Sequence, residues 1–220
     1  ARALERLGWS QAAVYGRFDD PAPAAQAVDL CVVATPDDAI ARVAAMIEPG
    51  DAVVMHLSGA TPLTALGSHR AASLHPLVAL PDPERGAELL RNAWYAVAGD
   101  PLAAELAGQL SGRLFEMADD DRPLYHAAAV VASNHVVALL GQAERIAAEI
   151  GLPFEALVAL VEATVDNVSD LGPAAALTGP AARGDNATIA FHVAALKSRL
   201  PDEVASYELL VELARRLAHQ

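Results

Sequence analysis

Four short polar segments of the sequence stand directly after apolar runs. They are Gly16-Arg17, Thr35-Pro36-Asp37, Ser58-Gly59 and His75-Pro76. If the apolar runs are neighbouring parallel strands, their carboxyl ends share one edge of a sheet, which is the edge where such sheets bind ligands. Each segment alone is also ordinary turn chemistry. Their common position after strands is what favours a binding site.

The residue type at Arg17 bears on which nucleotide such a site would bind. In a dinucleotide-binding fold, an acidic residue after the second strand binds the ribose hydroxyls of NAD, whereas an arginine suits the 2′-phosphate of NADP. The alternative is a solvated arginine in a turn beside Asp19 and Asp20. We therefore expect NADP as the cofactor, and we predict no metal site. The other predicted cofactor-binding residues are Ala34, Thr35, Pro36, Ser58 and Gly59.

A second set of polar side chains lies in and beside the longest apolar stretch, about 127–140. The surrounding helix is apolar nearly all round, so we expect it to be central and buried. His126 and Ser133, seven residues apart, share a face of this helix, and Asn134 lies about 100° further round. Buried polar groups need partners, either in a core network or in a ligand. A histidine that faces a ligand could act as a proton donor.

Two further observations concern the residues that could act on a substrate. The loop from Thr178 to Asp185 carries Arg183, which could bind a carboxylate, although the same residues also suit a plain helix–helix connection. Lys197 is the one lysine of the chain and its pattern places it near a helix end. The acid in a carbonyl reduction would therefore have to be a histidine, with His126 and His75 as the candidates.

The elements that must position these residues change in character along the chain. Strands alternate with helices at first, which predicts a right-handed parallel sheet, and only helices follow. We place the boundary near Ala118, between an α/β nucleotide-binding domain (1–118) and an all-helical domain (119–220). Strands are predicted at 11–16, 29–35, 52–57, 71–74, 94–98 and 113–117, and the later helices at 124–150, 154–170, 187–200 and 202–218.

Composition excludes several classes of protein. A formal charge of −13 disfavours nucleic acids and anionic membrane surfaces. Cys31 is the one cysteine, so no disulfide forms within the chain, and its apolar surroundings predict a buried thiol. The apolar stretch 127–140 is interrupted by Ser133, Asn134 and His135, which makes it a poor membrane span. The first residues lack a signal-peptide pattern, and we expect a cytoplasmic protein.

Five strings of residues resemble those of the Rossmann-like proteins with a C-terminal DUF2520 domain, in the 6-phosphogluconate-dehydrogenase-like superfamily. The resemblance implies NADP binding and a homodimer built by the helical domain. It also implies a first strand with a G-x-G-x-x-G turn, which is expected before Ala1 and is missing from this sequence. His75-Pro76 is similar to the active-site His-Pro of the related prephenate dehydrogenases. The strings are D-L-C-V-V-A-T-P-D-D-A-I (29–40), V-V-M-H-L-S-G-A (53–60), A-S-L-H-P-L (72–77), Y-H-A-A-A-V-V-A-S-N-H-V-V-A-L-L (125–140) and L-T-G-P-A-A-R-G-D (177–185).

Two functions from different classes follow. The first is an NADP-dependent oxidoreductase that reduces a carbonyl or imine of a small carboxylic acid, ketopantoate-like by analogy. The second is a non-catalytic nucleotide-binding sensor of the same fold. A purely structural dimerisation module is a third hypothesis, but it leaves the strand-end residues unexplained. For the enzyme, the expected roles are a proton donor or orienting group at His126, substrate binding by Ser133, Asn134 and His75, and carboxylate binding by Arg183.

Overall fold

The computed structural model describes residues 2–80 and 82–219. The chain forms two compact units, Ala1–Asn134 and His135–Gln220. The division between them falls later than the predicted boundary near Ala118. The reason is that the first turns of the long helix pack on the sheet, where Arg122 is fully buried and Tyr125 contacts a strand residue.

The first unit is built on a five-stranded sheet in the order β1-β2-β3-β4-β5. The first three strands run parallel, β4 runs antiparallel to β3, and β5 runs parallel to β4. The predicted Rossmann-like α/β fold is confirmed. The prediction of a wholly parallel sheet is wrong for the last two strands, because the connection after β3 returns at the same edge and pairs Pro76 with Tyr95. The strands are β1 (Leu30–Val33), β2 (Val53–His56), β3 (Arg70–Pro76), β4 (Trp94–Gly99) and β5 (Arg113–Glu116).

The strand predicted at 11–16 does not form. This segment has no regular structure, and Val14 in it is 72% exposed. Its apolar residues have strand propensity, but strand propensity is expressed only where a neighbouring strand supplies hydrogen bonds and packing. Within the described residues, the segment pairs with no strand of the sheet.

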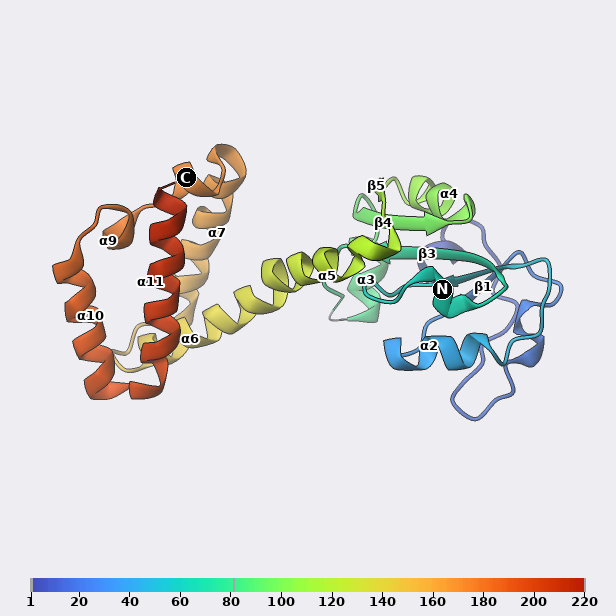
Figure 1. Cartoon of the computed structure of the whole chain (residues 1–220), viewed down its shortest axis with the longest axis horizontal. Helices are drawn as coiled ribbons and strands as arrows, with labels where there is room; N and C mark the ends of the chain where they lie inside the picture. Colours follow the sequence, from blue (N-terminus) through green and yellow to red (C-terminus); the bar gives the residue numbers. More distant parts are fainter. Residues whose placement is uncertain (1, 81, 220) are drawn as a thin grey trace. The chain divides into compact units, whose positions relative to one another are not determined.

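Helices cover both faces of the sheet (Figure 1). On one face, α4 (Leu102–Gln109) packs with the short helices α1 (Arg2–Glu5) and α3 (Pro83–Leu89). On the other face, α2 (Asp37–Ala44) packs with the 3-10 turns η1 (Ala22–Ala25) and η2 (Leu63–Leu66). Every residue of β2 is buried between the two layers. Cys31 is free and buried in the α2 layer, as the sequence predicts.

The helical second half is also confirmed. The helix predicted over 124–150 is divided into α5 (Arg122–Val130), a π-helical turn η4 (Val131–His135) and α6 (Val136–Ala148). In the helical unit, Gln142 on α6 donates hydrogen bonds to the Glu203 carbonyl and the Ser206 hydroxyl. The remaining helices are α7 (Phe154–Leu171), α8 (Pro173–Ala176), α9 (Gly179–Ala182), α10 (Asn186–Arg199), a 3-10 turn η5 (Pro201–Glu203) and α11 (Val204–Ala218).

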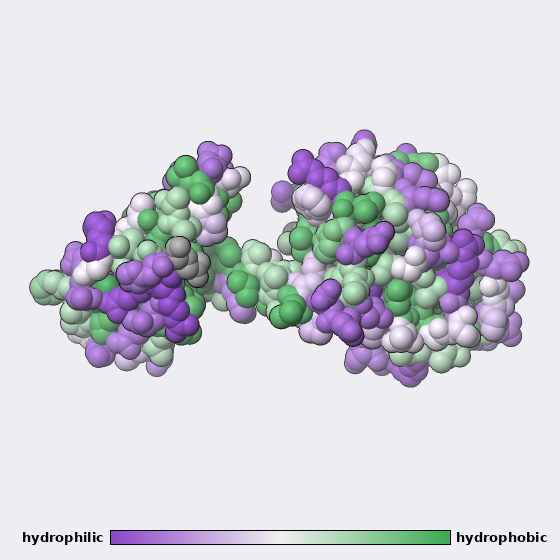
Figure 2. Space-filling view, turned by 45° about the horizontal axis from the view of Figure 1, so that its top comes forward, coloured by the Kyte–Doolittle hydropathy of each residue, from purple (hydrophilic) through white to green (hydrophobic). Residues whose placement is uncertain are grey.

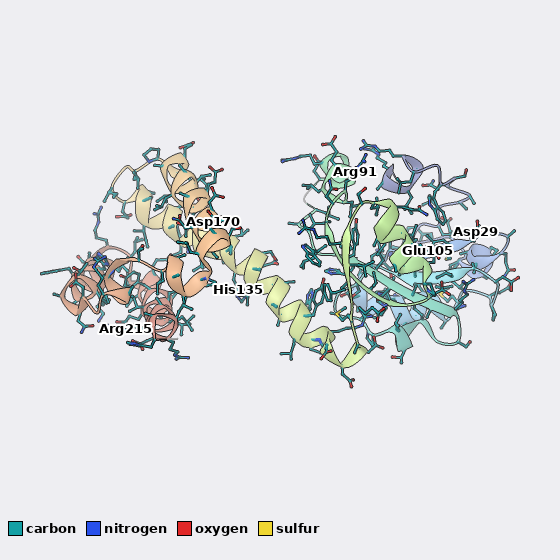
Figure 3. The ribbon with its side chains drawn as sticks, turned by 90° about the horizontal axis from the view of Figure 1, so that it is seen from above. Asp29, Arg91, Glu105, His135, Asp170 and Arg215 are labelled. Atoms are coloured by element: carbon teal, nitrogen blue, oxygen red, sulfur yellow. The ribbon has the colours of Figure 1, made fainter. Side chains whose placement is uncertain are left out.

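Apolar side chains are open at the surface of the helical unit (Figure 2). Within the described chain, no residue of α7 is buried, and Leu160 and Leu171 on it are 63% and 61% exposed. Charged side chains are also exposed, among them Asp29 before β1, Glu105 on α4 and Asp170 on α7 (Figure 3). The described part of the chain therefore does not bury the apolar side chains of α7.

The long helical run also departs from expectation. The run Asp119–Ala148 is long and apolar enough to cross a membrane by length and composition, although a core helix of a soluble protein meets the same test. None of its most apolar window is buried by the rest of the described chain. The prediction of a central, buried helix is therefore wrong for this chain. The apolar pattern reveals that a surface is fit for burial, and it does not reveal what covers that surface.

Candidate functional site at the strand ends

The carboxyl ends of β1, β2 and β3 lie at one edge of the sheet. The parallel register pairs Val33 with His56 and His56 with Ser73, so the residues that follow these strands come together. Three of the four predicted polar segments are placed at this edge: Thr35-Pro36-Asp37, Ser58-Gly59 and His75-Pro76. β1 and β2 end at the same level, whereas β3 continues for three residues beyond Ser73, so the loop after β2 lies beside the last residues of β3.

The fourth segment, Gly16-Arg17, follows no strand. Its Arg17 is exposed in a turn, with the guanidinium 5.8 Å from the centroid of the neighbouring Phe18 ring. The backbone N–H of Gly16 donates to the Asp19 carboxylate at 2.7 Å, which closes the turn. Arg17 therefore lies in the exposed segment before β1.

Ser58 connects the segments after β1 and β2. Its hydroxyl donates to the Asp37 carboxylate at 2.8 Å and accepts the backbone N–H groups of Ala60 and Thr61 at 3.1 and 2.9 Å. These three contacts use the hydroxyl fully and hold the loop after β2 against the first turn of α2. Ser58 thus has a demonstrable role in shaping this edge of the sheet.

Gly59 brings the loop after β2 onto the end of β3. A Cβ atom at this position would lie 3.0 Å from both Nε2 and Cε1 of His75, which is closer than such atoms normally approach. The absence of a side chain at Gly59 is what permits the imidazole to lie against the backbone. The loop and the histidine are therefore packed as one surface.

His75 forms a pair with Tyr125 of α5. His75 Nδ1 lies 2.5 Å from the Tyr125 hydroxyl, and the two rings meet edge to face with centroids 5.4 Å apart. Burial, together with the charges of His126 and Arg122, lowers the pKa of His75 below its usual range, while Asp37 opposes the shift. Burial raises the pKa of Tyr125. At neutral pH the pair is therefore an uncharged imidazole and an uncharged phenol.

The structure thus adds Tyr125 to the residues found from the sequence. The available signal was its place in the string Y-H-A-A, one residue before His126. The sequence alone does not distinguish Tyr125 from an ordinary packing residue, because a single tyrosine next to an apolar stretch most often serves to pack.

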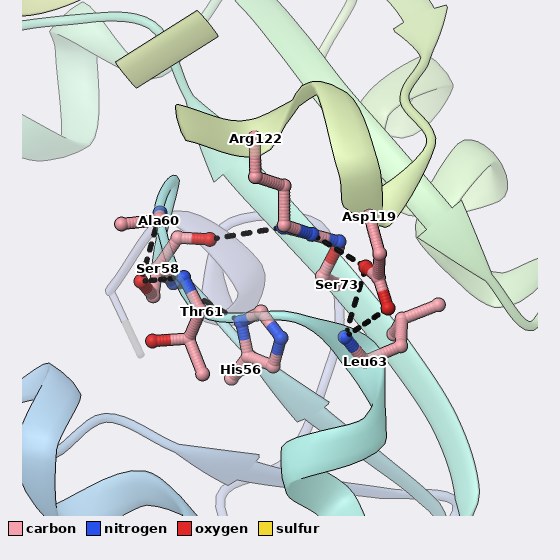
Figure 4. A network of polar contacts seen from close by, with 8 residues as sticks. All are labelled: His56, Ser58, Ala60, Thr61, Leu63, Ser73, Asp119 and Arg122. Carbon is pink, nitrogen blue, oxygen red and sulfur yellow. Dashed lines mark hydrogen bonds and ion pairs between the residues drawn. The ribbon is translucent and has the colours of Figure 1, made fainter. Parts of the chain in front are cut away.

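Arg122 fixes the start of α5 to the sheet. Its guanidinium, fully buried, donates to the Asp119 carboxylate at 2.6 Å, to the Ser73 hydroxyl at 2.8 Å and to the Ser58 carbonyl at 3.5 Å (Figure 4). Asp119 in turn accepts the backbone N–H of Leu63, with its two oxygens 3.0 and 2.9 Å away. The Asp-x-x-Arg spacing before the apolar stretch was the sequence signal for this network.

His56 lies in the same network as the last residue of β2. It is fully buried, and its Nδ1 accepts the backbone N–H of Ser58 at 3.3 Å. Burial and the charge of Arg122 lower the pKa of His56 to about 4, against smaller opposing effects of Asp119 and Asp37. His56 is therefore neutral at physiological pH and carries no part of the positive charge of this network.

Some buried polar atoms have no hydrogen-bond partner in the protein. In the described part of the chain these atoms are Thr35 Oγ1, His56 Nε2 and His126 Nδ1. Thr35 belongs to the predicted cofactor segment after β1, and His126 follows Tyr125 on α5. Because buried polar groups normally have partners, these three atoms leave hydrogen-bonding capacity that the protein itself does not use.

The other predicted residues are placed elsewhere. Ser133 and Asn134 lie exposed in η4, where the Ser133 hydroxyl contacts the Ala129 carbonyl at 2.7 Å and Asn134 Oδ1 at 2.9 Å. The π-helical turn breaks the regular spacing that put His126 and Ser133 on one face. Arg183 is exposed at the end of α9 in the helical unit. Asp185 caps α10 by accepting the Thr188 backbone N–H at 3.0 Å.

Comparison with known proteins extends the resemblance seen in the sequence. The structure is similar to protein TM1727 from Thermotoga maritima, with 28% identity and a TM-score of 0.73 over 86% of this chain and 77% of that one. It shares its fold with a putative NADP oxidoreductase, BF3122, from Bacteroides fragilis (23% identity, TM-score 0.78, 98% and 92% covered). The chain also shares its fold with an NADP-bound pyrroline carboxylate reductase from Plasmodium falciparum (11% identity, TM-score 0.57, 91% of this chain and 81% of that one covered).

A comparison with curated protein sequences gave no match. The model of a domain of unknown function, DUF2520, matches residues 96–214. This segment contains most of β4, all of β5 and nearly all of the helical unit, and it exceeds half of the chain. The resemblance found in the sequence is confirmed, and the chain belongs to the DUF2520 family.

Proposed function

We propose that the protein is an NADP-dependent oxidoreductase that reduces a carbonyl or imine carbon of a small carboxylic acid. The observation that carries the proposal is the packing of the loop at Gly59 against the His75–Tyr125 pair. It puts a proton-bearing pair directly beside the strand ends where a dinucleotide fold holds its nucleotide. Folds shared with an NADP-bound reductase and with a putative NADP oxidoreductase support the cofactor class.

The strand-end residues fit a dinucleotide. The unpartnered Thr35 Oγ1 and the glycine backbone at Gly59 supply a polar atom and a surface without a side chain. Ala34, Thr35 and Pro36 would hold the nucleotide from β1, and Ser58 and Gly59 from β2. Arg17 would bind the 2′-phosphate. When bound, NADPH supplies the hydride.

The chain itself would supply the proton and the substrate contacts. The group of His75, Tyr125 and His126 would contain the acid. Ser133, Asn134 and Arg183 remain proposed substrate contacts, with Arg183 for the carboxylate. A ketopantoate-like substrate is the nearest analogy, and the protein would act in the cytoplasm.

We also propose that the protein works as a homodimer through its helical unit. Many large apolar residues of α7 and α11 are exposed. Large exposed apolar patches on soluble proteins mark interaction sites, which supports an interface on these helices. A second copy is the occupant that presents a matching apolar face, as closed symmetric dimers require. The contributing side chains are Val158, Leu160, Val165, Val168, Leu171, Leu209 and Leu213.

Thermal denaturation with NADPH, with NADH and with neither tests the cofactor. NADPH at about 100 times its dissociation constant should stabilise the protein by about 2.7 kcal/mol, and NADH by less. Arg17→Ser should reduce the preference for NADPH, while Arg113→Ser, another exposed arginine stacked on an aromatic ring, should leave it unchanged. No stabilisation by either nucleotide contradicts the proposal.

NADPH consumption with a panel of 2-keto acids and cyclic imines tests the reaction. Oxidation with one member of the panel supports the enzyme. Stabilisation by NADPH without oxidation on any member favours the nucleotide-binding sensor instead.

A further inference from the structure

The site offers two side chains that could donate a proton to the substrate, Tyr125 and His126. They are neighbours on α5, so their side chains diverge by about 100° around the helix and cannot serve the same atom equally. We propose that Tyr125 is the catalytic acid and that His75 is the positioning residue that holds the phenol and returns its proton. This inference rests on the proposed reductase function and deepens it.

The contact geometry favours the phenol. Tyr125 Oη lies 2.5 Å from His75 Nδ1, so the oxygen has a partner that can hold it and exchange a proton with it, and both residues are only partly buried. The phenol is held on three sides, by the His75 ring edge, by Phe115 at a centroid distance of 5.5 Å, and by its own helix. His126, by contrast, has a buried Nδ1 without a partner, which suits a fixed contact with a ligand better than exchange of protons with solvent.

Two further residues fix the pair. Gly59 lies against Nε2 and Cε1 of His75, so the imidazole cannot move toward the loop after β2. Arg122, three residues before Tyr125, is bonded to Ser73 on the same strand as His75. The helix that carries the phenol and the strand that carries the imidazole are therefore joined at a second point, which holds the short contact in register.

The protonation states agree with this assignment. Burial keeps the phenol protonated and the imidazole neutral. A neutral imidazole bears one N–H, and if this is Nδ1–H it donates to Tyr125 Oη. The phenolic hydrogen is then free to point to the substrate. The opposite tautomer would accept that hydrogen and leave nothing to donate.

The proton balance of the step is closed by solvent. The hydride adds to the substrate carbon, the C=O or C=N π bond breaks, and the oxygen or nitrogen takes the proton of Tyr125 Oη. The phenolate takes the proton of His75 Nδ1, while His75 Nε2 takes one from water. A return of the imidazole to the Nδ1–H tautomer through solvent completes the cycle, with a net uptake of one proton.

The tautomer can be measured without any substrate. Nitrogen-15 NMR of the histidine rings separates protonated from unprotonated ring nitrogens, and His75→Gln identifies the signals of His75. We expect a protonated Nδ1 in His75, with a shift that changes in Tyr125→Phe. An unprotonated Nδ1 in the wild-type protein overturns the proposal, whatever the enzyme's substrate is.

Turnover then tests the role directly, with the panel of 2-keto acids and cyclic imines. Tyr125→Phe should lower kcat by on the order of 10²–10⁴-fold and leave NADPH binding unchanged. Tyr207→Phe is the matched control, because Tyr207 makes the same kind of contact with His192 Nδ1, at 2.7 Å with ring centroids 5.9 Å apart, in the helical unit. It should keep wild-type kcat.

The role of His75 has its own test. His75→Gln keeps an N–H group that can donate to Tyr125, so it should recover part of the kcat that His75→Ala loses; equal losses in the two variants contradict the positioning role. If Tyr125→Phe keeps kcat within about threefold of the wild type, the role proposed for Tyr125 is contradicted, while the proposed reductase function still holds. If the wild type consumes NADPH with no member of the panel, the proposed function and this inference fail together.

Discussion

The guanidinium of Arg122 on α5 donates a hydrogen bond to the hydroxyl of Ser73 in β3, across 2.8 Å and 49 positions of sequence. Both side chains are completely buried. The same guanidinium is paired with Asp119, so its charge is compensated where it lies. This contact places α5, and with it Tyr125, on the sheet edge that carries His75.

Removing this guanidinium should destabilise the sheet unit strongly. Arg122→Met leaves Asp119 and Ser73 without their partner, and loss of one member of a buried ion pair costs about 3–5 kcal/mol. Urea denaturation measures the change in the free energy of unfolding. Arg70→Ala is the control in the same unit, since Arg70 is 59% exposed in its pair with Asp100 and its loss should cost about 1 kcal/mol or less. Similar losses in the two variants would show that burial does not matter here.

Stability should fall as the pH falls from about 6.5 to 4. The pKa of His56 is lowered in the folded protein to about 4 from an ordinary 6.5, so the unfolded chain binds a proton first in this window. A difference of about 2.5 pKa units corresponds to roughly 3 kcal/mol that is present above pH 6.5 and lost by pH 4. The lowered pKa of His75 acts in the same direction.

Urea denaturation over this pH range checks the prediction. His56→Asn removes the titrating group and should flatten most of the slope between pH 6.5 and 4. The lowered pKa of Asp119 produces a separate loss at lower pH, because its carboxylate must be protonated there. An unchanged slope in His56→Asn would assign the pH dependence to other groups.

Substitutions of two glycines by alanine should have different effects, one on the position of the His75 ring and the other on the stability of the protein. Gly59→Ala puts a Cβ 3.0 Å from the His75 ring, so it should displace the imidazole, shift its NMR signals and lower NADPH-dependent turnover. Gly108→Ala, in the last turn of α4 with nothing within 4 Å of the new Cβ, should stabilise the protein by up to about 1 kcal/mol. NMR of Gly59→Ala measures the displacement of the His75 ring, and thermal denaturation of Gly108→Ala measures the gain in stability. Unperturbed His75 signals in Gly59→Ala would refute the close approach.

Charge on α7 should separate the proposed dimer. Leu160 and Leu171 are eleven residues apart, so they share one face of the helix. Changing both to Glu buries two carboxylates in an apolar interface, and sedimentation should show a monomer. Phe18→Glu, at a residue 94% exposed in the sheet unit, should leave the mass unchanged. A wild-type protein that sediments as a monomer contradicts the dimer itself.

Several elements that carry the site were accessible from the sequence because their signals are local. The apolar run at β1 and the Pro36-Asp37 step after it predict a buried strand and a helix start from residues next to one another. The same is true of Ser58-Gly59 after β2 and His75-Pro76 after β3. Parallel pairing then puts their ends at one edge, which is a general property of such sheets.

The sequence by itself therefore determined the α/β-then-helical order, the family and the strand-end residues, since hydrophobic periodicity and turn residues are properties of neighbouring positions. Only the tertiary structure decided the reversed sense of β4, the unpaired segment 11–16, the burial of Arg122 and the contact of His75 with Tyr125. Each of these depends on which distant segment supplies a hydrogen-bond partner or covers a side chain. The free energy of such long-range contacts depends on residues far apart in the sequence, so it cannot be inferred from neighbouring residues alone.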